Sequence, residues 1–163
     1  MFPSGLFFLG LGSTNLENQT YNSFLNSIGD VKANNVNFVR EVNILGDLVA
    51  KDVTFKFFKL NGKADVKNGT WEENLFLTGD LKVISGIFQG ELVSIVGRLL
   101  AEDCYFEKKL EVCSSEVKLD NCNVKSILFK KDDKSNRQEL YIKNTYIENL
   151  IFEKGNGLVR IDS

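Results

Sequence analysis

The side chains that most often carry out catalysis are either missing from this sequence or isolated in it. The 163 residues include no histidine, which excludes Ser-His-Asp or Cys-His catalysis, histidine-ligated zinc and histidine proton transfer within the chain. Glu72 and Glu73 are a single pair of acids that we expect to be solvated in a turn. No Walker-type phosphate loop and no metal-ligand spacing occurs. We therefore expect no catalytic residue, no cofactor, no metal site and no small-molecule substrate, and we predict that the protein is not an enzyme.

The three cysteines, Cys104, Cys113 and Cys122, are expected to act as small apolar core residues. Their small, odd number suits a reducing compartment. Cys104 and Cys122 take the same place in two consecutive copies of the repeat described below. Neighbouring parallel strands lie about 4.8 Å apart, which is long for the Cβ atoms of a disulfide. Whether these two thiols ever pair is left open.

The overall composition is that of a folded globular chain. There are 20 Lys+Arg against 22 Asp+Glu, giving a net charge of -2, with 43% hydrophobic residues. This balance argues against disorder and against a nucleic-acid partner. No apolar run approaches the length of about 18 residues that a membrane-spanning helix needs. One proline beside 13 glycines is an unusual ratio, and it prompts a search for repeats.

A repeat of 16 to 18 residues organises most of the chain, and the copy that begins at Ser115 is lengthened to 23. Its copies begin at Gly29, Gly46, Gly62, Gly79, Gly97, Ser115 and Gln138. The second and fourth positions after each start are apolar and alternate with polar residues, which is typical of a strand with one buried face. The sixth position holds short polar residues that tolerate a left-handed turn: Asn35, Asp52, Asn68, Ser85, Asp103, Asn121 and Asn144. The ninth holds bulky residues: Phe38, Phe55, Trp71, Phe88, Phe106, Val124 and Ile147.

A unit this short cannot bury its own apolar face, but stacked copies bury a continuous core. The leucine and asparagine spacing of leucine-rich repeats is absent. The sequence therefore predicts an all-β, single-stranded parallel β-helix (a solenoid) of about seven to eight coils. The position after each start is charged throughout: Asp30, Asp47, Lys63, Asp80, Arg98, Glu116 and Glu139. We expect these residues to form a solvated ladder that helps to fix the register.

Residues 1–28 lack the repeat, and we predict that they form a non-repetitive cap or tail in front of a β-helix domain at 29–163. Three interpretations stay open for this segment: a cap over the first coil, a peripheral contact with a membrane or partner, and a signal peptide. The apolar residues that would make the membrane or cap contact are Phe2, Leu6, Phe7, Phe8 and Leu9.

The extra residues of the copy that begins at Ser115 fall at 130–137 and predict a protruding loop of mixed charge. We expect the loop to be solvated, and it is the place where a partner contact is sought first. Its candidate contact residues are Lys130, Lys131, Asp132, Asp133, Lys134 and Arg137.

The C-terminal segment alternates like a strand, and no amphipathic helix follows to cover it. An open strand edge is a template for another chain. We therefore predict end-to-end self-association, with Leu158, Val159 and Ile161 at the assembling end.

The repeated phrase, glycine, a charged residue, leucine, and then alanine, Asp or Asn, and phenylalanine, resembles that of the bactofilins. It is clearest in Ile44–Phe55, Leu77–Phe88 and Ile95–Phe106, and the resemblance covers Ile28 to Phe152. It implies a right-handed β-helix that polymerises without nucleotide as a bacterial cytoskeletal scaffold, often with a membrane-contacting N-terminal tail. The phenylalanine-rich column and the loop depart from the family pattern, and they leave open a different, exported or host-directed β-helix protein.

Two functions follow as expectations. The first is a cytoplasmic structural protein whose partner is a second copy of itself and whose N-terminus offers a contact with a membrane. The second is a monomeric binding module, or an exported surface protein, that uses the side of the rod or the 130–137 loop.

Overall fold

The computed structural model describes residues 8–113, 116–130, 138–153 and 157–162, and every regular element among them is a β-strand. For residues 8–10, 157–158 and 161–162 only the backbone is described. The strands are β1 (Phe8–Leu11), β2 (Thr14–Tyr21), β3 (Leu25–Ile28), β4 (Val31–Leu45), β5 (Leu48–Trp71), β6 (Leu75–Ile84), β7 (Ile87–Phe88), β8 (Leu92–Val96), β9 (Leu99–Glu102), β10 (Tyr105–Cys113), β11 (Glu116–Asp120), β12 (Asn123–Phe129), β13 (Gln138–Lys143), β14 (Tyr146–Phe152) and β15 (Gly157–Asp162).

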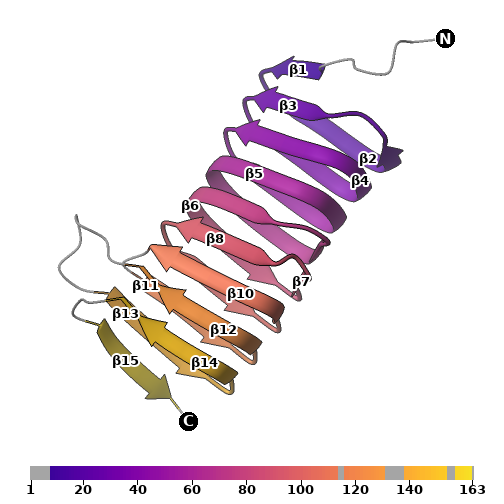
Figure 1. The fold of residues 1–163 in the computed structure, drawn as a ribbon. Coiled ribbons are helices and arrows are strands. Elements are labelled where there is room, and N and C mark those ends of the chain that lie inside the picture. Colours follow the sequence, from indigo (N-terminus) through magenta and orange to yellow (C-terminus); the bar gives the residue numbers. More distant parts are fainter. Residues whose placement is uncertain (1–7, 114–115, 131–137, 154–156, 163) are drawn as a thin grey trace.

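The strands wind into a β-solenoid of about eight turns, which confirms the predicted fold class. Each strand pairs in parallel with the strand one coil further on, so that Val31 lies beside Leu48 and Val42 beside Phe58. One coil contains three segments, which we call the first, second and third sides of the rod. In β4 they are residues 31–34, 36–38 and 41–45. Figure 1 shows the coils stacked into a rod, with β1 at one end and β15 at the other.

Two backbone features turn the chain at the same places in successive coils. A residue with φ between 47° and 58° separates the first and second sides in eight coils: Asn18, Asn35, Asp52, Asn68, Ser85, Asp103, Asn121 and Asn144. Asn and Asp adopt this left-handed conformation more readily than other side chains, so the predicted turn column is confirmed. The second feature is a column of stacked glycines that ends the third side. A Cβ on Gly79 would lie 1.8 Å from the carbonyl oxygen of Gly62.

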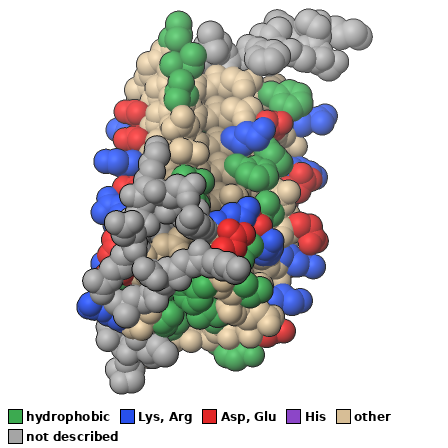
Figure 2. Space-filling model, turned by 60° about the vertical axis from the view of Figure 1, so that its left-hand side comes forward, with side chains coloured by type: hydrophobic (Ala, Val, Ile, Leu, Met, Phe, Trp, Pro, Cys, Tyr) green, Lys and Arg blue, Asp and Glu red, His purple; other side chains and the backbone are tan. Residues whose placement is uncertain are grey.

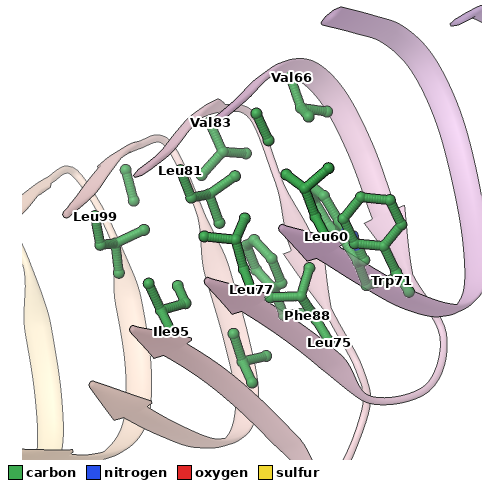
Figure 3. Close-up of a cluster of buried hydrophobic side chains, with 14 of the residues drawn as sticks. Leu60, Val66, Trp71, Leu75, Leu77, Leu81, Val83, Phe88, Ile95 and Leu99 are labelled. Atoms are coloured by element: carbon green, nitrogen blue, oxygen red, sulfur yellow. The ribbon is translucent and has the colours of Figure 1, made fainter. Parts of the chain in front are cut away.

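The core fills the inside of the coils, and its largest component is a column of aromatic rings. The rings of Trp71 and Phe88, and of Phe88 and Phe106, stack with centroids 4.3 Å apart. The stack continues through Phe55 to Phe38. Figure 3 shows Trp71 and Phe88 inside the rod, with aliphatic side chains of successive coils beside them. The bulky column predicted from the repeat therefore forms a continuous buried stack.

The predicted boundary at residue 28 is wrong for the described part of the N-terminal segment. Residues 12–28 form a complete coil: Thr14 pairs with Val31, Tyr21 with Phe38 and Leu25 with Val42. Gly12 and Asn18 have the positive φ values of the two turn columns. This coil covers the one that begins at Gly29, as a cap would, but it is a copy of the repeat. Its first side carries polar residues because it is the end of the stack and is exposed on its outer edge.

Candidate interaction surfaces

The two ends of the rod leave strand edges open. Among the described residues, β14 pairs only with β12, and β2 pairs only with β4. The side chains of Leu150 and Ile151 are 38% and 53% exposed, and those of Ile147 and Phe152 are half-buried against the core. The C-terminal end therefore presents both unpaired backbone groups and uncovered core side chains.

The predicted assembling residues lie in β15, which pairs with β13. Val159 lies beside Leu140 and Ile161 beside Ile142, so both follow the two apolar columns of the first side. Val159 is half-buried against the core. Leu158 lies beside Glu139, on the alternate register position, so it does not follow the apolar columns.

A column of charged side chains lies on the surface just before the first side of the rod. The carboxylate oxygens of Asp30 and Asp47 accept hydrogen bonds from the backbone N–H one coil further on, at 3.0 Å and 2.8 Å. Asp80 pairs with the guanidinium of Arg98 at 2.6 Å. The hydrogen bond from Arg98 is the main reason why the pKa of Asp80 is lowered. The solvated ladder predicted from the sequence is therefore present, and it ties neighbouring coils together.

A carboxylate anchors the base of the 130–137 loop. Glu111 is buried to 8% exposure and accepts hydrogen bonds from the ammonium groups of Lys109 at 2.5 Å and Lys130 at 2.6 Å. Burial alone would raise its pKa, but the two lysines outweigh burial, so the pKa of Glu111 lies below its ordinary value. The side chain of Gln138 donates a hydrogen bond to the carbonyl of Lys130 at 2.5 Å. Both ends of the loop are thus held together on the rod.

The second side changes character along the rod. Its outward row begins with Thr20, Asn37, Thr54 and Thr70 and continues with Ile87, Tyr105, Asn123 and Tyr146. Tyr105 and Tyr146 are 46% and 62% exposed. The N-terminal half is therefore a polar surface, and the C-terminal half carries exposed rings.

Cys104 and Cys122 are free, buried and adjacent in the stack. The Cys104 sulfur accepts a hydrogen bond from the N–H of Gly86 at 3.3 Å, and the N–H of Cys122 donates to Thr145 at 3.0 Å. A hydrogen bond to Cys122 and then burial raise the pKa of the Cys104 thiol. Both cysteines lie in the core, as the sequence predicts, and they form no disulfide in this structure.

Several predicted contact residues lie outside the described part of the chain. They are Phe2, Leu6 and Phe7 of the N-terminal contact and Lys131, Asp132, Asp133, Lys134 and Arg137 of the loop. Phe8 and Leu9 lie in β1, beside Leu25 and Asn26.

The sequence reasoning missed the third side of the rod. Its outward residues include exposed or half-exposed hydrophobic side chains in most coils, and a shallow groove of about 540 Å³ runs past Ile28, Leu45 and Phe76. The signal for this surface was the alternation of inward and outward residues in the segment that precedes each repeat glycine. It is harder to see there, because hydrophobic residues occur in the outward rows as well as in the inward rows.

Comparisons with protein-family models, curated proteins and solved structures give no match. Within the described residues, no group of three or more His, Cys, Asp or Glu side chains could hold a metal ion. The same part of the chain contains no helix able to span a membrane.

Proposed function

We propose that this chain is a non-enzymatic structural protein whose rods join end to end into a polymer or scaffold. The observation that carries the proposal is the exposed C-terminal coil, where β14 presents an open edge and half-buried core residues. Solenoids that stay monomeric normally end in polar caps. An open edge with apolar side chains pairs readily with another strand.

The strand columns support a specific joint between two copies. Val159 lies in the column of Leu140, two residues after a repeat start, and Thr14 takes that place in the first coil. The N-terminal β2 of a second copy can therefore continue the column above β15. In the same way, Phe8 and Leu150 belong to one column of the third side. β1 of the second copy can therefore pair with β14. The two pairings between copies, β15 with β2 and β14 with β1, match the way in which strands of neighbouring coils pair within one copy.

The test is electron microscopy of the purified chain, with light scattering over a concentration series. We expect filaments, or growth with concentration, in the native protein. The double variant Val159→Lys, Ile161→Lys should abolish end-to-end growth into filaments, because lysine side chains cannot be buried between two coils. Val49→Lys is the matched control, since Val49 is 55% exposed in the middle of the first side. It should assemble like the native chain.

A folded monomer at every concentration would contradict the proposal. That outcome would favour the alternative, a binding module that uses the side of the rod or the 130–137 loop. The observation in favour of the alternative is the anchored loop base, where Glu111, Lys130 and Gln138 fix the position from which the loop leaves the rod. Circular dichroism and the fluorescence of Trp71, the only tryptophan, report whether each variant is folded.

A further inference from the structure

The third side of the rod carries exposed hydrophobic side chains along most of the stack, interspersed with polar ones such as Asn43, Asn61 and Ser94. In most coils its outward residues alternate with buried ones. Its exposed or half-exposed hydrophobic residues are Phe24, Ile28, Leu45, Phe57, Phe76, Leu92, Val96, Leu128 and Ile151. Figure 2 shows hydrophobic side chains in a row along the rod at its N-terminal end and again near its C-terminal end, between margins lined with charged side chains.

The few charges on this side neutralise one another. Lys59 lies 3.7 Å from Glu41 and also covers the ring of Phe57 at 5.2 Å. Glu111 is held between Lys109 and Lys130. Among the described residues of this side, no concentrated positive charge is therefore left to attract lipid phosphates or nucleic acid. The surface fits a partner that has exposed hydrophobic side chains, some polar ones and no strong net charge.

The dimensions of the third side require a long, flat partner. Seven coils at about 4.8 Å spacing and five residues at about 3.3 Å give a face of roughly 30 Å by 17 Å. Two such faces bury on the order of 1,000 Å², which is near the lower limit for a specific interface. The whole face must therefore be covered at once. A second copy of the rod has the same length, the same flat face and the same repeat.

We propose that two copies pack through their third sides as an antiparallel, two-fold dimer. The coil of Phe76 lies at the centre of the side. Glu41 lies two coils before it and Lys109 two coils after it, in the same outward row. A two-fold axis at Phe76 therefore places Glu41 of each copy opposite Lys109 of the other, and Phe76 opposite itself.

The charges also discriminate against the parallel arrangement. With both rods pointing the same way, Lys59 faces Lys59 and Glu111 faces Glu111 of the second copy. Like charges directly opposite one another destabilise an interface. In the antiparallel arrangement the outward position of Lys59 faces that of Ser94, and Phe57 faces Leu92. This dimer goes beyond the end-to-end joint and does not depend on it.

Zero-length crosslinking with a carbodiimide tests the dimer directly, because it joins a carboxylate to an amine only when the two are in contact. Within one chain Glu41 and Lys109 are four coils apart, about 19 Å, so a crosslink between them can form only between copies. Mass spectrometry should find the Glu41–Lys109 crosslink in the dimer band of the native chain. Its absence, while other crosslinks form, would overturn the antiparallel register.

Sedimentation equilibrium measures the dissociation constant of the dimer. The measurement uses the Val159→Lys, Ile161→Lys variant, so that end-to-end growth does not interfere. We expect a dimer there. Phe76→Glu should make it monomeric, and Ile87→Glu, on the second side, is the matched control and should not. Glu41→Lys should weaken the dimer about tenfold, because each substitution acts twice at a two-fold interface. Adding Lys109→Glu should restore most of the affinity.

The outcomes separate this dimer from the end-to-end joint. A monomer in the end-blocked background, or a dimer that Phe76→Glu leaves unchanged, would overturn the dimer, whatever happens to the filaments. Loss of filaments in the end-blocked variant with the dimer retained would support both. The charge exchange also guards against misfolding, since Glu41 and Lys109 have surface side chains and the double exchange keeps the net charge.

Discussion

At the scale of single residues, the glycine column shows how a backbone conformation and a close contact act at one position. Gly79 has φ of 134°, and a Cβ there would overlap the carbonyl oxygen of Gly62. Gly12 also has positive φ, 94°, but a Cβ there meets nothing within 4 Å. The two glycines therefore separate backbone strain from steric overlap.

We predict that Gly79→Ala destabilises the fold by about 3 kcal/mol or more, and that Gly12→Ala costs about 1–2 kcal/mol. The difference arises because alanine at position 12 is strained only by its backbone conformation. Alanine at position 79 also overlaps the neighbouring coil and forces the two coils apart. Urea unfolding followed by Trp71 fluorescence measures both. Equal losses for the two variants would show that close stacking of the glycines does not contribute.

A second pair of residues, Trp71 and Gly69, pack directly against each other in the core, where the indole occupies the space that a side chain at position 69 would need. Among the described residues, the indole nitrogen of Trp71 is the one buried side-chain nitrogen or oxygen without a hydrogen-bond partner. An unpaired buried donor of this kind is costly. The indole is accommodated because residue 69 is glycine: a Cβ there would lie 2.7 Å from the six-membered ring of Trp71.

We expect Trp71→Phe alone to be destabilising, because it leaves a void beside Gly69, and Gly69→Ala alone to be destabilising through overlap. Together they should cost about 1 kcal/mol less than the sum of the two, because the new methyl group fills the void that the smaller ring leaves. Thermal unfolding by circular dichroism measures the cycle without tryptophan fluorescence. Simple additivity of the two losses would contradict this account of the packing.

At the scale of strands and turns, the regular columns could be predicted from the sequence. Each turn column needs a particular backbone conformation, so residue type alone reveals it: Asn35 and Asp52 have the left-handed φ that their side chains suggest. The coil at 12–28 was missed, although Gly12 and Asn18 mark it. At the end of a stack the outer edge is exposed, and the apolar pattern that identifies a strand is relaxed there, as at Thr14.

The candidate surfaces were harder to predict than the coils. The place of Val159 in an apolar column follows from the alternating sequence around it. The apolar third side does not, because Leu45 and Phe76 read as further core residues until the structure shows that they point outward. Long-range pairs such as Glu111 and Lys130, which hold the base of the loop, depend on the register of neighbouring coils.

The loop base has a predictable dependence on pH. The pKa of Glu111 is lower in the folded chain than in the unfolded chain. Its ion pairs therefore contribute stability above the ordinary pKa of glutamate, and this contribution is lost as the pH falls through the lowered folded value. Glu111→Gln should cost about 1 kcal/mol near pH 7.

The difference between the native chain and Glu111→Gln should shrink as the pH falls below 4, measured by urea unfolding at a series of pH values. Glu73→Gln is the control, since Glu73 is exposed and lies 3.7 Å from Lys56. It should change stability by only a few tenths of a kcal/mol at any pH. A loss at Glu111 that stays constant down to pH 3 would mean that its charge does not stabilise the loop base.

At the scale of the whole molecule, each coil contacts only its neighbours, so stability should vary along the rod. Each central coil is stacked between two neighbouring coils, and the central coils contain the stacked rings of Trp71, Phe88 and Phe106. Each end coil has a neighbouring coil in one direction only. In a solenoid, local opening therefore starts at the ends and reaches the centre last.

Hydrogen exchange can use this gradient to test assembly without any substitution. In dilute solution, amides of the terminal strands β1, β2, β14 and β15 should exchange fastest among the strands, and those of β5 and β7 slowest. If copies join end to end, the exposed edges of β2 and β14 become central, because each receives hydrogen bonds from the next copy. We expect their exchange to slow at least tenfold on concentration, while β7 stays unchanged. Slowing confined to the third-side segments would instead indicate that lateral pairing is the only contact the rods make.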